Sequence, residues 1–403
     1  MLRFPEFRGE WTQYKLGECF DERNEQFPES SDYPLMAFIA GKGVTEKGEK
    51  YDRSALVKDA PNKKYKRTEL GDFIYSSNNL ESGSIGLNRY GKACISPVYS
   101  IFKAKKGFDP YFIGTILTQK SFISEMIKYR QEVVYGQWKI PEKEFLNLII
   151  RIPSFCEQQR IAEFLEAEDR LISAQEQKVE FLKAHKKGLM QQLFPQPGAT
   201  TPALRFPGFT GDWQEKPLCS LAAKVNQKNK DFAVTRVLTN SATEGVVDQN
   251  AYFERDIAVK DNTNNYYIVD KDDFVYNPRI SSTAPVGPIS INKVGKGIMS
   301  PLYTVFKFQQ GHIAFFEQYF QTEIWHPYLK SIANFGARFD RMNITTDGFF
   351  NMPLFVPSIE EQQKIAECLE TLDNLIAAES KKLESLKAHK KGLMQQLFPQ
   401  PVK

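Results

Sequence analysis

The stretch LKAHKKGLMQQLFPQP occurs at residues 182–197 and again, letter for letter, at residues 386–401. The similarity extends upstream without a gap, because both copies begin with PS-x-x-EQQ and continue through IAE-x-LE. A second repeat precedes each half of the chain, as LRFPEFRGEW from Leu2 and LRFPGFTGDW from Leu204. The sequence therefore contains an internal duplication, which predicts two similar halves with pseudo-two-fold symmetry.

Each copy of the repeat predicts one long helix. The S-x-x-E pattern at Ser154 and again at Ser358 is a capping box, and no proline follows before the LFP ending. Alternating steps of four and three residues then land mainly on aliphatic side chains, as in the a/d seam of a coiled coil. Polar interruptions at Lys186 and Lys390 would help to fix the register, and the pseudo-symmetry favours an antiparallel pair. The predicted positions of the helix and partner interface are Ile161, Leu165, Ile172, Val179, Leu182, Leu189, Leu193, Ile365, Leu369, Leu372, Ile376, Leu383, Leu386, Leu393 and Leu397.

The identical LKAHKKGLMQQLF endings extend beyond what a helix seam requires. Their lysines lie beside apolar residues in both copies. We therefore expect two identical exposed faces, each of which docks one copy of the same partner protein.

Two variable segments lie between the repeats and share a skeleton. DFIY at 72–75 corresponds to DFVY at 273–276, and GKACISPVYSIF at 91–102 corresponds to GKGIMSPLYTVF at 295–306. These stretches are typical of short strands joined by Asn, Gly and Ser turns, and helical patterns follow them.

The predicted fold class is α+β. Two α/β domains are separated by two long helices that form an antiparallel coiled coil with pseudo-two-fold symmetry. The predicted boundaries are 1–152 for the N-terminal domain, 153–197 for the central helix, 198–355 for the C-terminal domain and 356–403 for the C-terminal helix.

Composition limits the classes of function. A formal charge of +4 over 403 residues permits a nucleic-acid partner without requiring one. No apolar run approaches the length of a membrane span, so no membrane partner is expected. The five cysteines are odd in number and include no C-x-x-C pair, which argues against zinc and disulfides and favours a cytoplasmic setting.

Basic and amide side chains gather on the predicted loops of both variable domains. Arg and Lys bind phosphates or guanine edges, and Asn and Gln can pair with adenine. Singly, such residues are more often ordinary solvated surface, so their repetition in two equivalent domains carries the prediction. The DNA-binding candidates are Lys63, Lys64, Lys66, Arg67, Asn78, Asn79, Arg89, Gln137, Lys139, Arg279, Lys296, Arg338, Arg341 and Asn343.

The motifs of several enzyme classes are absent. The sequence contains no phosphate-binding G-x-x-x-x-G-K-[ST], no H-E-x-x-H and no G-x-S-x-G. Asn277-Pro278-Arg279 lacks the second proline and the aromatic residue of an amino-methyltransferase loop. We predict a binding protein with no catalytic residues, no metal site and no cofactor of its own, although a scattered carboxylate–lysine nuclease site stays open.

The order of elements resembles the specificity (S) subunit of type I restriction–modification systems over essentially the whole chain. The motifs that carry the resemblance are P-x-x-EQQ-x-IA at the start of each long helix and LFP at its end. The resemblance implies that the variable domains are target recognition domains, each reading one half of a bipartite, asymmetric target in double-stranded DNA.

The same resemblance implies the partners of the chain. The helices would act as a spacer ruler and dock two methyltransferase (M) subunits, and restriction (R) subunits would join the full complex. S-adenosylmethionine, ATP and Mg would be bound by those partner subunits. The alternative that the sequence leaves open is a two-headed coiled-coil scaffold without DNA specificity.

Overall fold

The computed structural model describes residues 2–46, 63–133, 137–196, 198–252, 260–334 and 340–398. The chain divides into two compact units. Unit 1 comprises Met1–Gln175 and Leu383–Lys403, and unit 2 comprises Glu176–Lys382.

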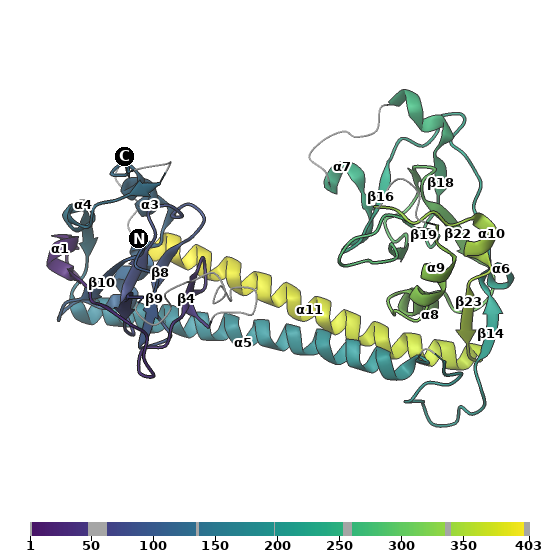
Figure 1. Ribbon diagram of the computed structural model, residues 1–403, viewed down its shortest axis with the longest axis horizontal. Helices are drawn as coiled ribbons and strands as arrows, with labels where there is room; N and C mark the ends of the chain where they lie inside the picture. The colour runs from purple at the N-terminus through teal and green to yellow at the C-terminus, as the bar shows by residue number, and fades with distance from the viewer. Residues whose placement is uncertain are drawn as a thin grey trace. The chain divides into compact units, whose positions relative to one another are not determined.

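Unit 1 contains a domain of mixed helices and antiparallel strands (Figure 1). Its strands are β1 (Thr12–Lys15), β2 (Phe20–Glu22), β3 (Gln26–Phe27), β4 (Ala37–Ile39), β5 (Gly43–Thr45), β6 (Tyr65–Thr68), β7 (Phe73–Tyr75), β8 (Ile85–Leu87), β9 (Ala93–Ile95), β10 (Ser100–Ala104), β11 (Gln131–Glu132), β12 (Trp138–Lys139) and β13 (Ile149–Ile152). Its short helices are α1 (Leu16–Cys19), α2 (Pro110–Leu117), α3 (Lys120–Ile127) and α4 (Glu142–Asn147). The main sheet has the order β2-β10-β7-β8, a second sheet has the order β3-β6-β9, and β1 pairs with β13.

Unit 2 repeats this plan. Its strands are β14 (Gln214–Pro217), β15 (Ala222–Lys224), β16 (Leu238–Ser241), β17 (Gly245–Asp248), β18 (Tyr267–Val269), β19 (Phe274–Tyr276), β20 (Ile289–Ile291), β21 (Gly297–Met299), β22 (Thr304–Phe308) and β23 (Pro353–Val356). Its short helices are α6 (Leu218–Leu221), α7 (Gln249–Tyr252), η4 (Lys260–Asn265), α8 (Ile313–Phe320), α9 (His326–Ile332) and α10 (Thr346–Phe350). The main sheet β15-β22-β19-β20 has the same order as the main sheet of unit 1, and β14 pairs with β23 as β1 does with β13. The predicted mixed domains with a shared skeleton are confirmed.

Two long helices complete the fold: α5 (Phe155–Leu193) and α11 (Ile359–Leu397), each of 39 residues. In unit 2, Lys178 pairs with Glu379 and Lys186 pairs with Asp373, both at 2.6 Å. As the residue number rises along α5 it falls along α11, so the helices are antiparallel in this unit (Figure 1).

The antiparallel pairing also occurs in unit 1. There Lys390 of α11 pairs with Asp169 of α5, which are the repeat equivalents of Lys186 and Asp373. Leu397 and Ile161 belong to one buried cluster, which places the end of α11 beside the start of α5. The predicted antiparallel helix pair is therefore confirmed in each unit.

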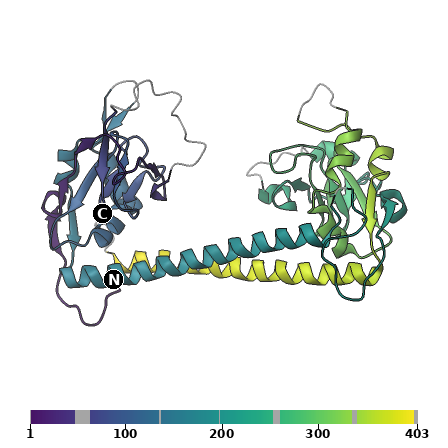
Figure 2. The same ribbon diagram turned by 60° about the horizontal axis from the view of Figure 1, so that its bottom comes forward.

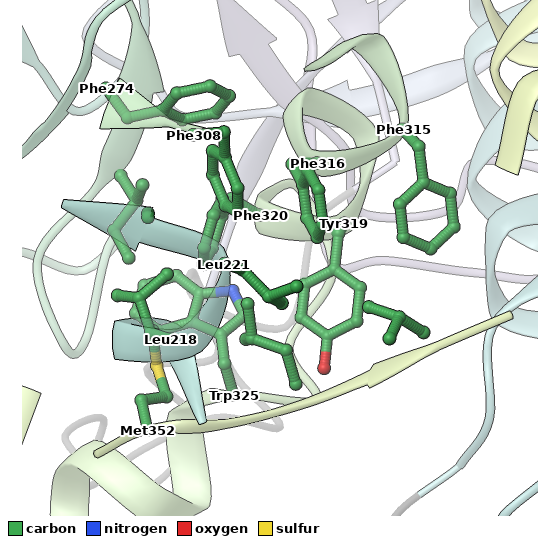
Figure 3. Close-up of a cluster of buried hydrophobic side chains, with 14 of the residues drawn as sticks. Leu218, Leu221, Phe274, Phe308, Phe315, Phe316, Tyr319, Phe320, Trp325 and Met352 are labelled. Atoms are coloured by element: carbon green, nitrogen blue, oxygen red, sulfur yellow. The ribbon is translucent and has the colours of Figure 1, made fainter. Parts of the chain in front are cut away.

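The ends of the helices are built into the domain cores. Leu193 and Phe194 are buried with Trp213, Phe315 and other side chains of unit 2. The aromatic centre of that core includes Phe308 and Phe316, whose rings stack at 3.8 Å (Figure 3).

The equivalent residues Leu397 and Phe398 are buried in the core of unit 1. The expectation that the repeated LKAHKKGLMQQLF endings expose their apolar residues to a partner is therefore wrong for these positions. Each ending fills the core of the neighbouring domain, because that core needs large apolar side chains to exclude water.

The start of the chain lies in unit 1 beside the end of α11. The backbone N–H of Leu2 donates to the carbonyl oxygen of Gln396 at 2.7 Å. Figure 2 shows the marked N-terminus beside the yellow end of α11. Among the helices in the described part of the chain, none is both long enough and apolar enough to cross a membrane.

Candidate nucleic-acid interface

Two segments of unit 1 meet at what we call the first loop edge, residues 77–79 and 137–140. The backbone N–H of Trp138 donates to Oδ1 of Asn78 at 2.6 Å, and that of Ile140 donates to Oγ of Ser77 at 3.0 Å. These bonds join the loop after β7 to the strand β12. They bring together four predicted candidates that are exposed: Asn78, Asn79, Gln137 and Lys139.

Unit 2 has an equivalent second loop edge, residues 278–280 and 340–343. The backbone N–H of Met342 donates to the carbonyl oxygen of Pro278 at 3.0 Å, and that of Ile280 donates to the carbonyl oxygen of Asp340 at 3.0 Å. The pairing joins the loop after β19 to the segment before α10. It brings together the predicted candidates Arg279, Arg341 and Asn343.

Among the described residues, the acidic partners of the cations at both edges are partly exposed carboxylates. Lys139 lies 3.5 Å from Glu142, and the Nε atoms of Arg279 and Arg341 lie 3.8 and 3.9 Å from Asp340. Ion pairs of this kind contribute little energy in water, since solvent screens them. These weak ion pairs leave the three side chains able to exchange a carboxylate for another polar partner.

One predicted contact is excluded by its burial. The Lys66 side chain is only 6% exposed, and its ammonium group donates to the carbonyl oxygen of Tyr99 at 2.9 Å. Burial lowers the pKa of this lysine, and the nearby carboxylate of Glu142 opposes that shift. Lys66 faces the interior of the domain, on the side of β6 opposite to Arg67, and it is removed from the set of DNA contacts.

The remaining candidates occupy other places. The Arg89 guanidinium lies over the ring of Tyr111 and 3.4 Å from Asp169, so it faces the helices of unit 1 rather than the first loop edge. Lys296 lies 3.6 Å from Asp270 and takes no part in the bonds that form the second loop edge. Arg338 lies outside the described residues.

Three candidates precede or belong to β6. Lys63 and Lys64 are exposed just before the strand. Arg67 is half-buried on it, between two aromatic rings. None of the exposed candidates is tested as a DNA contact by the structure, so these remain predictions.

The predicted seam positions of the helices are all buried or half-buried. The two polar interruptions are paired as well, Lys186 with Asp373 and Lys390 with Asp169. Burial raises the pKa of Asp169, but bonds from Lys390 and Tyr111 outweigh it and hold this pKa below its usual value. Each charged pair ties the two helices together at one register.

Sequence reasoning missed two arginines that attach the repeated leaders to the helices. In unit 2, Nε and Nη2 of Arg205 each donate to a carboxylate oxygen of Glu361 at 2.7 Å. Arg3 and Glu157 make the same two bonds at the same distances in unit 1. The sequence contains a signal for these ion pairs, since each repeated LRFP carries an arginine and each repeated EQQ carries a glutamate.

The glutamine that follows each of these glutamates fixes a second element. Gln158 accepts from the backbone N–H of Asp109, the residue that caps α2, and donates to the carbonyl oxygen of Pro153. Gln362 makes the equivalent bonds to His312 before α8 and to Pro357. The EQQ motif is thus a structural joint between each long helix and its domain.

Exposed apolar side chains recur at equivalent positions of the long helices. Leu171 of α5 is 47% exposed, and its repeat equivalent Leu375 of α11 is 41% exposed. Phe155 and Ile359 at the helix starts are a second such pair. Repeated exposure of apolar residues is a feature of surfaces that another protein covers.

Comparison with known proteins gives consistent results. The model of a family described as type I restriction modification DNA specificity domain matches residues 8–184 and 212–388. A putative type I restriction enzyme MjaX specificity subunit of Methanocaldococcus jannaschii is 25% identical over 311 residues, 73% of this chain and 68% of that protein. The type I restriction enzyme MjaVIII specificity subunit of the same organism is 24% identical over 374 residues, 86% of this chain and 84% of that protein.

Solved structures share the fold. The S subunit of a type I restriction–modification system from M. genitalium superposes with a TM-score of 0.59 at 14% identity, covering 100% of this chain and 99% of that one. A chain from a study of complex assembly and conformational transition of the type I R-M system gives a TM-score of 0.52 at 16% identity, covering 98% and 100%.

Proposed function

The chain belongs to the family of type I restriction modification DNA specificity domains, and from this premise we propose that it is the DNA specificity subunit of a type I restriction–modification complex. Each of its two target recognition domains binds one half of a bipartite target in double-stranded DNA. The subunit selects the sequence, and the methylation and cleavage chemistry resides on its partner subunits.

The observation that carries the proposal is that both family domains present a loop edge built from the same two segments. The side chains at these edges differ, since Asn78 and Lys139 occupy the first and Arg279 and Arg341 the second. Different donor and acceptor patterns select different bases in the major groove. The two halves of the target should therefore differ in sequence.

Long-read sequencing of the host genome tests this function directly. We expect one split, asymmetric methylated motif to disappear when the gene is deleted and to return when it is restored. An unchanged pattern of methylated adenine would count against the proposal and would favour a scaffold that binds proteins at both domains. Salt-sensitive DNA binding in the presence of partner subunits separates these two functions, since phosphate contacts weaken as salt rises.

The repeated helices support two copies of one methyltransferase subunit as partners. Leu171 and Leu375 are exposed at the same position of the repeat, so one partner surface fits both. S-adenosylmethionine is expected on these partners, and ATP and Mg are expected on restriction subunits. The complex would act on the chromosome in the cytoplasm.

A docking experiment tests this partner surface. We expect Leu171→Glu with Leu375→Glu to abolish capture of methyltransferase subunits from a co-expressing cell, and each single change to reduce the captured amount to about half. The control is Phe181→Glu, because Phe181 is 69% exposed on α5 but its repeat equivalent is Ser385. Equal loss of capture in the control and the double variant would contradict a symmetric docking surface.

A further inference from the structure

Arg67 of unit 1 is clamped between two aromatic rings. The central carbon of its guanidinium lies 4.1 Å from the ring centroid of Phe27 and 4.4 Å from that of Tyr33. Both rings therefore cover the planar group by stacking and cation–π attraction. The guanidinium keeps only its edge, where the N–H donors lie, for a further partner.

The clamp is itself held in place. The Tyr33 hydroxyl donates to Glu69 at 2.6 Å, and Nη2 of Arg23 donates to the other oxygen of the same carboxylate at 2.8 Å. Phe27 belongs to β3, whose pairing with β6 places it opposite Tyr65 in the sheet. The bond to Glu69 holds the Tyr33 ring, and the sheet holds the backbone of Phe27, so the two rings favour one orientation of Arg67 before any ligand arrives.

The donors of Arg67 have no protein partner in the described part of the chain. Its Nε atom is buried and makes no hydrogen bond, whereas its two Nη atoms are unbonded and reach the solvent. Lys92 lies 5.7 Å from the Tyr33 ring and adds a second positive charge beside the clamp. A fixed, unpaired arginine with its faces covered is arranged to donate two parallel hydrogen bonds in its own plane.

We propose that Arg67 reads one guanine, through O6 and N7, in the half-site bound by unit 1. This inference rests on the proposed function and names the base that one of its domains selects. A guanine edge fits the clamp better than a phosphate does. A phosphate oxygen accepts from many directions, whereas base readout needs a donor pair of fixed orientation.

The clamp belongs to one domain only among the described residues. In unit 2, β18 pairs with β21 as β6 pairs with β9 in unit 1. The position of β18 that corresponds to Arg67 is Ile268. Ile268 lies opposite Ile298, just as Arg67 lies opposite Cys94. The side chain of Ile268 is buried and apolar, so it offers no hydrogen-bond donor to a base. The guanine assigned to Arg67 should therefore occur in one half of the split target, without a counterpart read by the same position of unit 2.

The test replaces Arg67 in the native host and maps methylated adenine by long-read sequencing. Arg67→Met fills the space between the rings without donors, and Arg67→Lys keeps the charge but cannot donate the paired bonds. For both variants we expect discrimination at one guanine of one half-site to fall by about 5- to 150-fold. The other half-site should be unchanged.

Two further variants control the result. Tyr33→Phe keeps the ring but frees it from Glu69, so we expect a smaller relaxation at the same base. Arg236→Met alters an exposed arginine of unit 2, paired with Asp248 at 2.9 Å, and should leave the half-site of unit 1 intact. The melting temperature of each purified variant shows whether it folds.

The possible results separate the two proposals. A uniform loss of methylation at all sites, with no change in motif, would make Arg67 a phosphate contact and overturn the inference. An unaltered motif in a folded Arg67→Met variant would overturn it as well, while the specificity function would stand. If the wild-type gene directs no split motif at all, the proposed function fails and the inference falls with it.

Discussion

The joint between Arg205 and Glu361 offers a sharp test of how unit 2 is attached to α11. The Glu361 side chain is 2% exposed, the Arg205 side chain is 19% exposed, and the carboxylate accepts two bonds of 2.7 Å. In Glu361→Gln, one of these acceptor oxygens becomes an NH₂ group that faces the donors of Arg205. The paired arginine then loses its counter-charge and one hydrogen bond in a site that water hardly reaches.

The magnitude follows from this burial. Breaking a fully buried ion pair costs about 3–5 kcal/mol, and partial exposure of the arginine reduces the penalty. We expect Glu361→Gln to lower the free energy of unfolding of unit 2 by about 2–4 kcal/mol. Urea unfolding followed by tryptophan fluorescence measures it, because Trp213 in the adjoining leader is buried in the core of unit 2.

Glu360→Gln is the matched control. Glu360 lies in the same first turn of α11 as Glu361, so both changes remove the same favourable interaction with the helix dipole. The side chain of Glu360 is exposed, whereas that of Glu361 is buried. We expect the control to change stability by less than about 1 kcal/mol. If both variants lose the same stability, the reasoning about the joint is refuted. The double variant Arg205→Met with Glu361→Leu should recover part of the loss, since no unpaired buried charge remains.

Three further predictions concern base readout, helix length and pH. Arg341→Ala should weaken discrimination at one base position of the unit 2 half-site by about 1–3 kcal/mol in a methylation map, whereas a loss that is uniform over all sequences would indicate a phosphate contact. Deleting four residues within 165–180, together with their repeat equivalents in α11, removes ~6 Å of helix and should shorten the spacer of the methylated motif by about one or two base pairs; an active complex with an unchanged spacer would contradict the ruler. Because the pKa of Asp169 is lowered, its carboxylate stabilises the fold above about pH 4 and loses this contribution as the pH falls through the lowered value. Asp169→Asn should therefore lower the melting temperature strongly at pH 7 and progressively less toward pH 3, and a loss independent of pH would argue against this account.

The architecture was predictable because its signals are periodic or repeated. A seam with steps of three and four residues specifies a helix and the face that it buries, and an exact repeat specifies that the helix occurs twice. The antiparallel direction follows from the symmetry, and the pairs Lys186–Asp373 and Lys390–Asp169 agree with it. The strand skeleton of the two domains was visible for the same reason.

The loop edges were predictable in part. In the sequence, YGQWKI at 135–140 loosely resembles FGARFDRMNI at 335–344, and this resemblance indicates equivalent positions in the two domains. The sequence carries no sign that these segments lie against the loops after β7 and β19, since they are far apart in the chain. The docking of LFP endings into the cores was missed for a related reason, because an apolar residue at a helix end suits a core and a partner surface equally well.

What the sequence by itself determined is the duplicated plan, the helix pair, the class of each domain and the family to which they point. What only the tertiary structure decided is which basic residues are available to DNA. Alternation along β6 requires Lys66 and Arg67 to face opposite sides of the sheet, but it does not say which one is buried. That choice depends on Tyr99, Phe27 and Tyr33, which reach β6 only when the chain folds. Local patterns record the periodicity of an element, whereas the burial and pairing of one side chain depend on neighbours that are distant in the sequence.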